Sequence, residues 1–176
     1  ALLALTIGAF AIGTTEFVIV GLVPTIAEQL TISLPSAGLL VSIYAQGVAI
    51  GAPVLTALTG RMPRKQLLLA LMVLFTAGNL LAWQAPGYAT LIFARLLTGL
   101  AHGVFFSIGS TIATSLVPKE KAASAIAIMF GGLTVALVTG VPIGTFIGQH
   151  FGWRETLLAV SILGVIALVS SLILVP

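Results

Sequence analysis

The sequence predicts an all-α membrane protein with six transmembrane helices. Of its 176 residues, 59% are hydrophobic and 6% are charged, and the mean hydropathy is +1.24. Soluble domains normally carry about a quarter charged residues, so lipid is the solvent that suits this chain. Helices are expected because the alternating segments of about ten residues typical of a membrane barrel are absent. Six apolar runs are long enough to cross a bilayer core of about 30 Å: 2–24, 36–58, 66–84, 88–117, 122–146 and 154–175.

The first three runs each contain an acid or amide well inside the apolar stretch. Glu16 lies near the middle of the first run, which ends at Pro24. This run is long, contains an acid and lacks a charged leader, so we expect a permanent helix and not a secretory signal. Gln46 lies at the middle of the second run, ahead of Pro53, and Asn79 lies in the outer third of the third run.

Each of the last three runs has one distinctive feature: the fourth contains an arginine, the fifth contains a proline, and the sixth begins at an arginine. Arg95 lies about seven residues into the fourth run, and His102 follows seven residues later. Seven residues are close to two helical turns, so both side chains share one helix face. Pro142 interrupts the fifth run and weakens its hydrogen-bond ladder, and the sixth run begins at Arg154.

Basic residues between the runs predict the orientation in the bilayer. Two connections, between runs two and three and between runs four and five, hold five of them: Arg61, Arg64, Lys65, Lys119 and Lys121. Cytoplasmic loops are enriched in Lys and Arg, so we expect these connections, and with six spans both termini, in the cytoplasm. The other boundary has only Arg154. It also carries three aromatic residues of the kind found at the lipid headgroup level: Trp83, Tyr88 and Trp153.

The composition argues against several classes of function. The net charge of +3 is explained by the basic loops, so we expect no nucleic-acid partner. The chain has no cysteine, which excludes disulfides and thiolate metal sites. It shows no phosphate-binding glycine loop, no paired catalytic carboxylates and no nucleophile beside a base. We therefore expect no enzyme activity, no metal and no cofactor.

The chain reads as two similar copies of a three-span unit: about 1–86 and about 87–176. A shift of 86 residues lays Glu16 on His102, and a shift of 89 lays Gly51 on Gly140. A unit with an odd number of crossings must have its second copy inverted. Inverted repeats are typical of transporters that alternate access around a site near the bilayer midplane. Similarity of composition alone is the alternative explanation.

Two charged side chains, Glu16 and Arg95, lie inside apolar runs. A charge at the centre of a spanning helix costs about 2.5–3.5 kcal/mol on insertion scales, so both should face protein or a water-filled cavity. At about 1.5 Å per residue they lie at similar depths, which makes an ion pair feasible if the first and fourth helices are neighbours. We predict a proton-coupling site of Glu16, Arg95 and His102, in which Glu16 takes up a proton from outside and releases it inside. A static ion pair and a neutral, hydrogen-bonded histidine are the alternatives.

Other polar and small residues are candidates for a substrate path or for packing. Three side chains are predicted to line a substrate cavity: Gln46, Asn79 and Tyr44. Amides also join helices, at about 0.6 kcal/mol on average, so packing is their alternative role. Glycines four residues apart, such as Gly99 and Gly103, permit close contact between helix backbones, and we expect them mainly to serve packing.

The stretch from Gly51 to Lys65 resembles the cytoplasmic loop motif that the major facilitator superfamily has between its second and third helices. The likeness is to the amino-terminal half of a transporter from the drug:proton antiporter branch, which includes sugar and arabinose efflux permeases. Gly60 stands where that family usually has aspartate, and Pro63 stands where it usually has glycine. The resemblance implies a gating role for three basic residues of this loop: Arg61, Arg64 and Lys65.

Two further stretches resemble motifs of the same family. The stretch 91–99 is similar to the fourth-helix motif, whose arginine the family associates with proton coupling, and this points to Arg95. The stretch 140–154 is similar to the antiporter motif of the fifth helix and contributes three residues to it: Gly140, Pro142 and Gly144. The segment from Gly99 to Gly103 is most similar to the efflux-permease subgroup.

The resemblance implies proton-coupled efflux of a small organic solute, such as a sugar or a drug, across the bacterial inner membrane by alternating access. Helices one and four would line the cavity, with helices two and five beside them. Alternating access needs two halves, so we expect a second bundle as partner, either a missing carboxy-terminal half or a second copy of this chain. A passive channel or facilitator and a non-transporting membrane scaffold are the alternatives. The sequence does not identify the solute.

Overall fold

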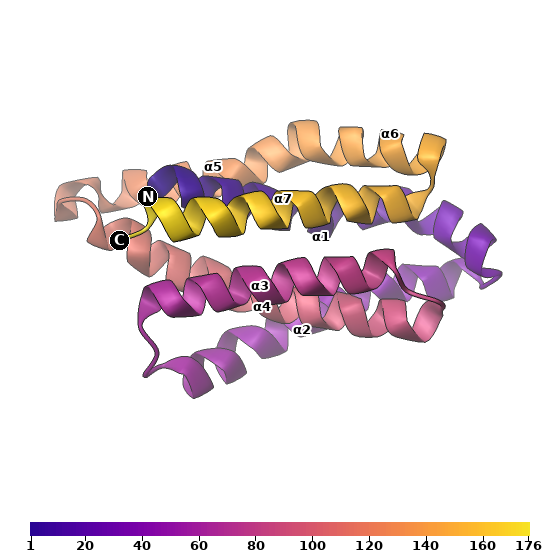
Figure 1. Cartoon of the computed structure of the whole chain (residues 1–176), viewed down its shortest axis with the longest axis horizontal. Coiled ribbons are helices and arrows are strands. Elements are labelled where there is room, and N and C mark those ends of the chain that lie inside the picture. The colour runs from indigo at the N-terminus through magenta and orange to yellow at the C-terminus, as the bar shows by residue number, and fades with distance from the viewer.

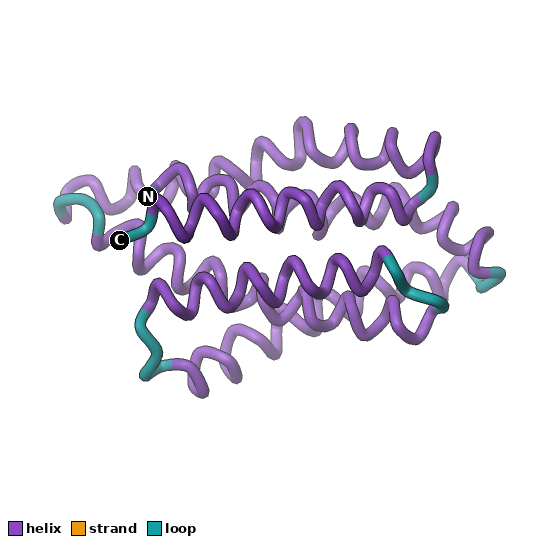
Figure 2. Tube along the Cα trace, in the orientation of Figure 1, coloured by secondary structure: helices purple, strands orange, loops and turns teal.

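The computed structural model describes residues 1–176 as helices joined by short loops (Figure 1), and Figure 2 shows no strand among them. Six segments are long and apolar enough to cross a membrane, and the fifth, Lys119–Phe151, combines several helical pieces. The predicted six-span all-α fold is confirmed. In chain order the elements are α1 (Leu2–Leu30), α2 (Leu34–Thr59), α3 (Arg64–Trp83), α4 (Tyr88–Ser115), η1 (Lys119–Lys121), α5 (Ala122–Val135), η2 (Ala136–Gly140), α6 (Val141–Phe151) and α7 (Trp153–Leu174).

Local sequence explains where several helices begin and end. Ser33 caps the start of α2 by accepting a hydrogen bond from the Ser36 backbone N–H at 3.2 Å. Thr31 closes α1 in the left-handed region, with φ 54°. The predicted end of the first helix at Pro24 is wrong, because α1 continues to Leu30 with this proline inside it.

Both chain termini lie at one end of the bundle, together with the α2–α3 and α4–α5 connections (Figure 1). The five basic residues of those connections therefore share that end. Successive spans run antiparallel, so α4 starts at the end opposite to the start of α1. The second three-span unit is thus inverted relative to the first.

Helix packing follows the same symmetry. α1 packs on α5 and α7, whereas α4 packs on α2 and α3, which are the corresponding spans of the other unit. α3 and α7, the last spans of the two units, pack on each other, and α1 also contacts α4. This pattern is what a pseudo-twofold axis between inverted repeats produces.

Glycines make the crossing of α2 and α4 unusually close. A Cβ atom added at Gly47 would lie 2.6 Å from the Leu96 carbonyl oxygen and 3.1 Å from the Gly99 Cα. A Cβ at Gly103 would lie 2.5 Å from the Val48 oxygen. No larger residue fits at these positions without separating the two helices.

The fifth span contains a π-helical turn at η2, where Figure 1 shows the ribbon bending between α5 and α6. Pro142 has no backbone N–H, so the Val138 carbonyl lacks the partner that an α-helix would give it. The wider turn accommodates this loss, with the Val141 N–H bonding the Ala136 carbonyl. The predicted interruption at Pro142 is thus a change of helical register within one continuous span.

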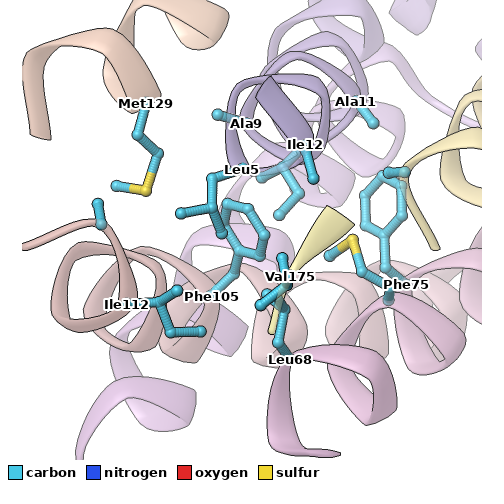
Figure 3. Packing of buried hydrophobic residues seen from close by; sticks show 14 of the residues in the cluster. Leu5, Ala9, Ala11, Ile12, Leu68, Phe75, Phe105, Ile112, Met129 and Val175 are labelled. Carbon is cyan, nitrogen blue, oxygen red and sulfur yellow. The ribbon is translucent and has the colours of Figure 1, made fainter. Parts of the chain in front are cut away.

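The apolar core consists of two large clusters, one toward each end of the bundle, and a small third cluster of Leu67, Leu71 and Val104. The cluster near the termini includes Leu5, Phe75 and Phe105 from three helices (Figure 3). The other includes Leu22 and Trp153. Between the clusters, along α1, α3 and α4, lie six buried polar residues that we call the midplane polar layer: Thr14, Thr15, Thr76, Asn79, Arg95 and Thr98.

One of the three aromatic residues at the end of the bundle opposite to the termini does not have the predicted environment. Trp153 is buried in the apolar core, so its ring is not exposed to lipid headgroups. Its ring lies 4.4 Å from the guanidinium carbon of Arg154, which also donates a hydrogen bond to the Trp83 carbonyl at 2.9 Å. Arg154 thus ties the start of α7 to the end of α3, an attachment that the aromatic pattern alone could not indicate.

Candidate functional site

Four side chains from three helices meet at the edge of the midplane polar layer. Glu16 comes from α1, Tyr44 from α2, and Arg95 and His102 from α4. The side chain of Glu16 is 28% exposed and that of His102 is 14% exposed, whereas Tyr44 and Arg95 are 2% and 1% exposed. The site therefore has an accessible acidic edge and a buried basic interior.

Arg95 forms the buried interior of the site. Its Nη1 donates to the Thr15 carbonyl at 2.9 Å, and its Nε donates to the Leu40 carbonyl at 3.3 Å. The guanidinium carbon lies 4.2 Å from the centroid of the Tyr44 ring, a cation–π contact that suits a desolvated cation. Its Nη2 is buried and has no hydrogen-bond partner.

The feasible ion pair between Glu16 and Arg95 does not form. His102 is the only basic side chain within 4.0 Å of the Glu16 carboxylate. Arg95 instead directs two donors to main-chain carbonyls of α1 and α2, so it joins three helices. Arg95 bonds the carbonyl of Thr15, the residue before Glu16, but depth along the helices could not show how the guanidinium would orient.

His102 lies between the acid and the phenol. Its Nδ1 is 3.0 Å from the Tyr44 hydroxyl oxygen and 3.7 Å from Glu16 Oε2. The imidazole also packs against the Phe106 ring, with 5.0 Å between centroids. One ring nitrogen thus faces both a neutral donor and a carboxyl group.

Two of the three predicted cavity residues are buried and already hydrogen-bonded. Asn79 is 1% exposed, accepts a hydrogen bond from the Thr15 hydroxyl at 2.8 Å, and donates to the Phe75 carbonyl at 2.9 Å. It joins α1 to α3, so the expectation that it faces a substrate path is not met here. Tyr44 is likewise occupied by Arg95 and His102, whereas Gln46 is exposed on α2.

An aromatic row extends from the site toward the fifth span and was missed from the sequence. Phe106 lies 4.8 Å from Phe130 of α5, between ring centroids, and follows His102 on α4. Phe106 is four residues after His102, so helical periodicity could have placed it on the same face. Its pairing with α5 depends on how the helices pack.

The family comparison decides the class of protein. A family model of the Major Facilitator Superfamily matches residues 5–176. The chain belongs to the major facilitator superfamily. The relatives that match it are named as membrane transport proteins.

Several curated transport proteins match nearly the whole chain. The chain is 58% identical over 176 residues to YtbD of Bacillus subtilis (strain 168), named an uncharacterized MFS-type transporter. It is 52% identical over 175 residues to the inner membrane transport protein YdhP of Escherichia coli (strain K12). AraJ of the same strain is 35% identical over 175 residues. These matches cover 99–100% of this chain but only 44–45% of each relative, so the chain spans less than half of their length.

A solved structure supports the fold. The crystal structure of the peptide transporter POT (E310Q mutant) in complex with alafosfalin matches with a TM-score of 0.86. The match covers 97% of this chain and 37% of that one, at 16% sequence identity. At that identity the likeness shows the fold alone and nothing about the substrate.

The loop motif of the superfamily lies at the end of the bundle that holds the termini. Arg61 and Arg64 are exposed and Lys65 is half-buried, and none of them forms an ion pair within the chain. Their side chains are therefore available to groups outside this bundle.

The fifth-helix motif of the superfamily faces α1. A Cβ atom at Gly144 would lie 2.7 Å from Val18 Cγ2, and one at Gly140 would collide with the Thr14 side chain. Pro142 points away from this contact and is exposed. The glycines therefore let the fifth span approach α1 closely, beside the π turn.

Proposed function

We propose that this chain is one six-helix half of a proton-coupled exporter that moves a small organic solute, such as a sugar or a drug, by alternating access. Membership of the superfamily supports transport as the activity. The coupling to protons and the outward direction rest on the site around Glu16.

The position of Glu16 is the observation that carries the proposal. Its carboxylate lies near the middle of α1, 28% exposed, at the edge of the midplane polar layer. An acid at membrane depth is costly in lipid but can be tolerated beside polar groups and cavity water. Arg95 supplies a positive charge in the buried interior that stays fixed. Glu16 is negative when it is ionised and neutral when it has bound a proton, so the net charge of the site changes with the proton.

This arrangement provides for antiport. When the cavity opens outward, Glu16 takes up a proton, and when it opens inward, the proton leaves as the solute binds. Gln46 is exposed on α2, two residues after Tyr44, and is our candidate for solute contact. Arg61, Arg64 and Lys65 are candidates to contact the second half and gate the inner side.

A second bundle is needed to complete the path. Only 22% of the residues in the most apolar stretch of α2, and likewise of the fifth span, are buried within this bundle, the lowest share among the six spans. We propose that their exposed faces are covered by a second six-helix half, from a longer chain or from a second copy. A stable monomer of this chain alone that transports after reconstitution would contradict this.

We place the protein in the bacterial inner membrane with both termini in the cytoplasm. The basic connections share the end of the bundle that holds the termini, as cytoplasmic loops would. The name of YdhP, an inner membrane transport protein, supports the location.

Flux measurements on the complete transporter in proteoliposomes test the proposal. Radiolabelled arabinose and a lipophilic fluorescent dye serve as probes, with and without an imposed proton gradient. We expect gradient-driven flux of at least one probe in the wild type and its loss in Glu16→Gln, with Glu120→Gln as the control acid in a loop. Gradient-driven flux that survives in Glu16→Gln would refute proton coupling through this residue, and flux that ignores the gradient in the wild type would indicate a passive facilitator.

A further inference from the structure

We propose that Tyr44 and Glu16 compete for a single lone pair on His102, so that the hydrogen bond of Tyr44 changes when Glu16 is protonated. Tyr44 is then a positioning residue of the proton site. This inference rests on the proposed function and deepens it, because it describes how uptake of a proton by Glu16 reaches a neighbouring helix.

The tautomer of His102 follows from the burial of Tyr44. The phenol is 2% exposed, and its only hydrogen-bond partner is His102 Nδ1, at 3.0 Å. A buried O–H without an acceptor is costly, so the hydroxyl must donate to this nitrogen. His102 Nδ1 therefore presents its lone pair toward Tyr44, and the ring proton is on Nε2.

With this tautomer, His102 and an ionised Glu16 do not attract each other directly. Glu16 Oε2 is 3.7 Å from Nδ1, which is beyond hydrogen-bond distance, and both atoms present lone pairs. Once Glu16 has taken up a proton, its O–H becomes a donor, and Nδ1 lies 3.7 Å away as an acceptor. The nitrogen has one lone pair, so Tyr44 must release it.

The exchange moves no proton between side chains. A proton from cavity water forms the O–H bond on Glu16, and that O–H then donates to His102 Nδ1. Tyr44 stays a neutral phenol and turns its O–H toward another acceptor, such as cavity water. The reverse sequence returns the proton from Glu16 to water.

The exchange changes which helix is bonded to α4. With Glu16 ionised, the hydrogen bond joins α2 to α4 through Tyr44 and His102. With Glu16 protonated, it joins α1 to α4 instead. The Tyr44 ring also lies 4.2 Å from the Arg95 guanidinium carbon, so a displaced phenol would disturb the contact that holds this cation.

No other titratable group competes at this position. Arg95 is the only further charge at the site, and two of its donor groups, Nε and Nη1, are directed to the carbonyls of Leu40 and Thr15. The fifth span contributes the Phe130 ring through Phe106. The charged residues of α3 and α7 lie in the first turns of those helices, away from the midplane.

The test uses ultraviolet resonance Raman spectra of the complete transporter, which report the hydrogen bonding of a phenol. The wild-type spectrum minus that of Tyr44→Phe isolates Tyr44, and the corresponding difference with Tyr88→Phe gives a matched control. The carboxyl band that is present in the infrared spectrum of the wild type and lost in Glu16→Gln belongs to Glu16. We expect the Tyr44 signal to change over the same pH interval in which this band appears, and the Tyr88 signal to stay constant.

Two variants of Glu16 separate hydrogen bonding from charge. Glu16→Gln can donate an N–H to His102 and should fix Tyr44 in its released form at every pH. Glu16→Leu cannot donate and should fix Tyr44 in its bonded form. Both lose the negative charge, so identical Tyr44 spectra in the two variants would overturn the proposal, as would a wild-type Tyr44 signal that is constant across the Glu16 titration.

The outcome is distinguishable from failure of the proposed function. If the proposed function is wrong, gradient-driven flux is absent in the wild type or survives in Glu16→Gln, whatever the spectra show. If only the lone-pair exchange is wrong, flux depends on Glu16 while the Tyr44 signal stays unchanged. The wild-type pH series decides the matter even if a Glu16 variant does not fold.

Discussion

The substitution Gly47→Ala should weaken the bundle at the crossing of α2 and α4. The added methyl carbon would lie 2.6 Å from the Leu96 carbonyl oxygen, whereas ordinary contact begins at 3.4 Å. The contact atom is backbone, so one helix must retreat by about 0.8 Å, since no side chain can rotate away. Overpacking of this kind costs about 1–3 kcal/mol.

Gly38→Ala is the matched control on the same helix. A Cβ atom at Gly38 meets nothing within 4 Å, so this change only replaces glycine by a better helix former. That replacement is worth up to about 1 kcal/mol in an exposed helix, and Gly47→Ala gains the same term. The difference between the two variants therefore isolates the crowding, and we expect Gly47→Ala to be less stable than Gly38→Ala by about 1–3 kcal/mol.

Unfolding by SDS in mixed micelles measures the free energy of unfolding for both variants. Tyr44 lies one turn before Gly47, so Gly47→Ala should also reduce gradient-driven flux. Equal stability of the two variants would refute the close crossing of α2 and α4 described above.

Two further substitutions test parts of the fold away from Glu16. Asn79→Leu should lower the free energy of unfolding by about 0.6–1.7 kcal/mol, the range for interhelical polar contacts, and leave flux unchanged; a selective loss of flux would return Asn79 to the substrate path. Gly152 has φ 103° and ψ 151°, a conformation essentially restricted to glycine, with no atom near the added Cβ. Gly152→Ala should therefore cost about 1–3 kcal/mol through backbone strain alone, measured by the same SDS unfolding, and no change would contradict the observed backbone conformation.

The spans and the neighbourhood of the site could be predicted from the sequence because both follow from short-range rules. Apolar runs of membrane length set the six helices, and the seven-residue spacing of Arg95 and His102 put them on one helix face. Both do contact Tyr44. The depth of Glu16 likewise followed from its distance along α1.

The hydrogen-bond partners of the polar side chains could not be predicted. They depend on where helices cross, and local sequence patterns do not determine those crossings. Arg95 bonds the carbonyls of Thr15 and Leu40 since the glycine crossing brings α2 against α4. Asn79 meets Thr15 because α1 and α3 approach at that level. Trp153 is buried because of how the start of α7 packs, although its position in the chain suggested the membrane boundary.

Thiol labelling at position 16 tests the central claim, that the Glu16 side chain faces a space that water can reach. The chain has no cysteine, so Glu16→Cys introduces its only thiol. Ala101→Cys, which is fully buried, and Val73→Cys, which is exposed on α3 at membrane depth, serve as controls in the complete transporter with any other cysteines replaced. The account predicts that a membrane-impermeant thiol reagent modifies Cys at position 16 and neither control; a thiol at position 16 that resists the reagent applied from both sides would contradict it.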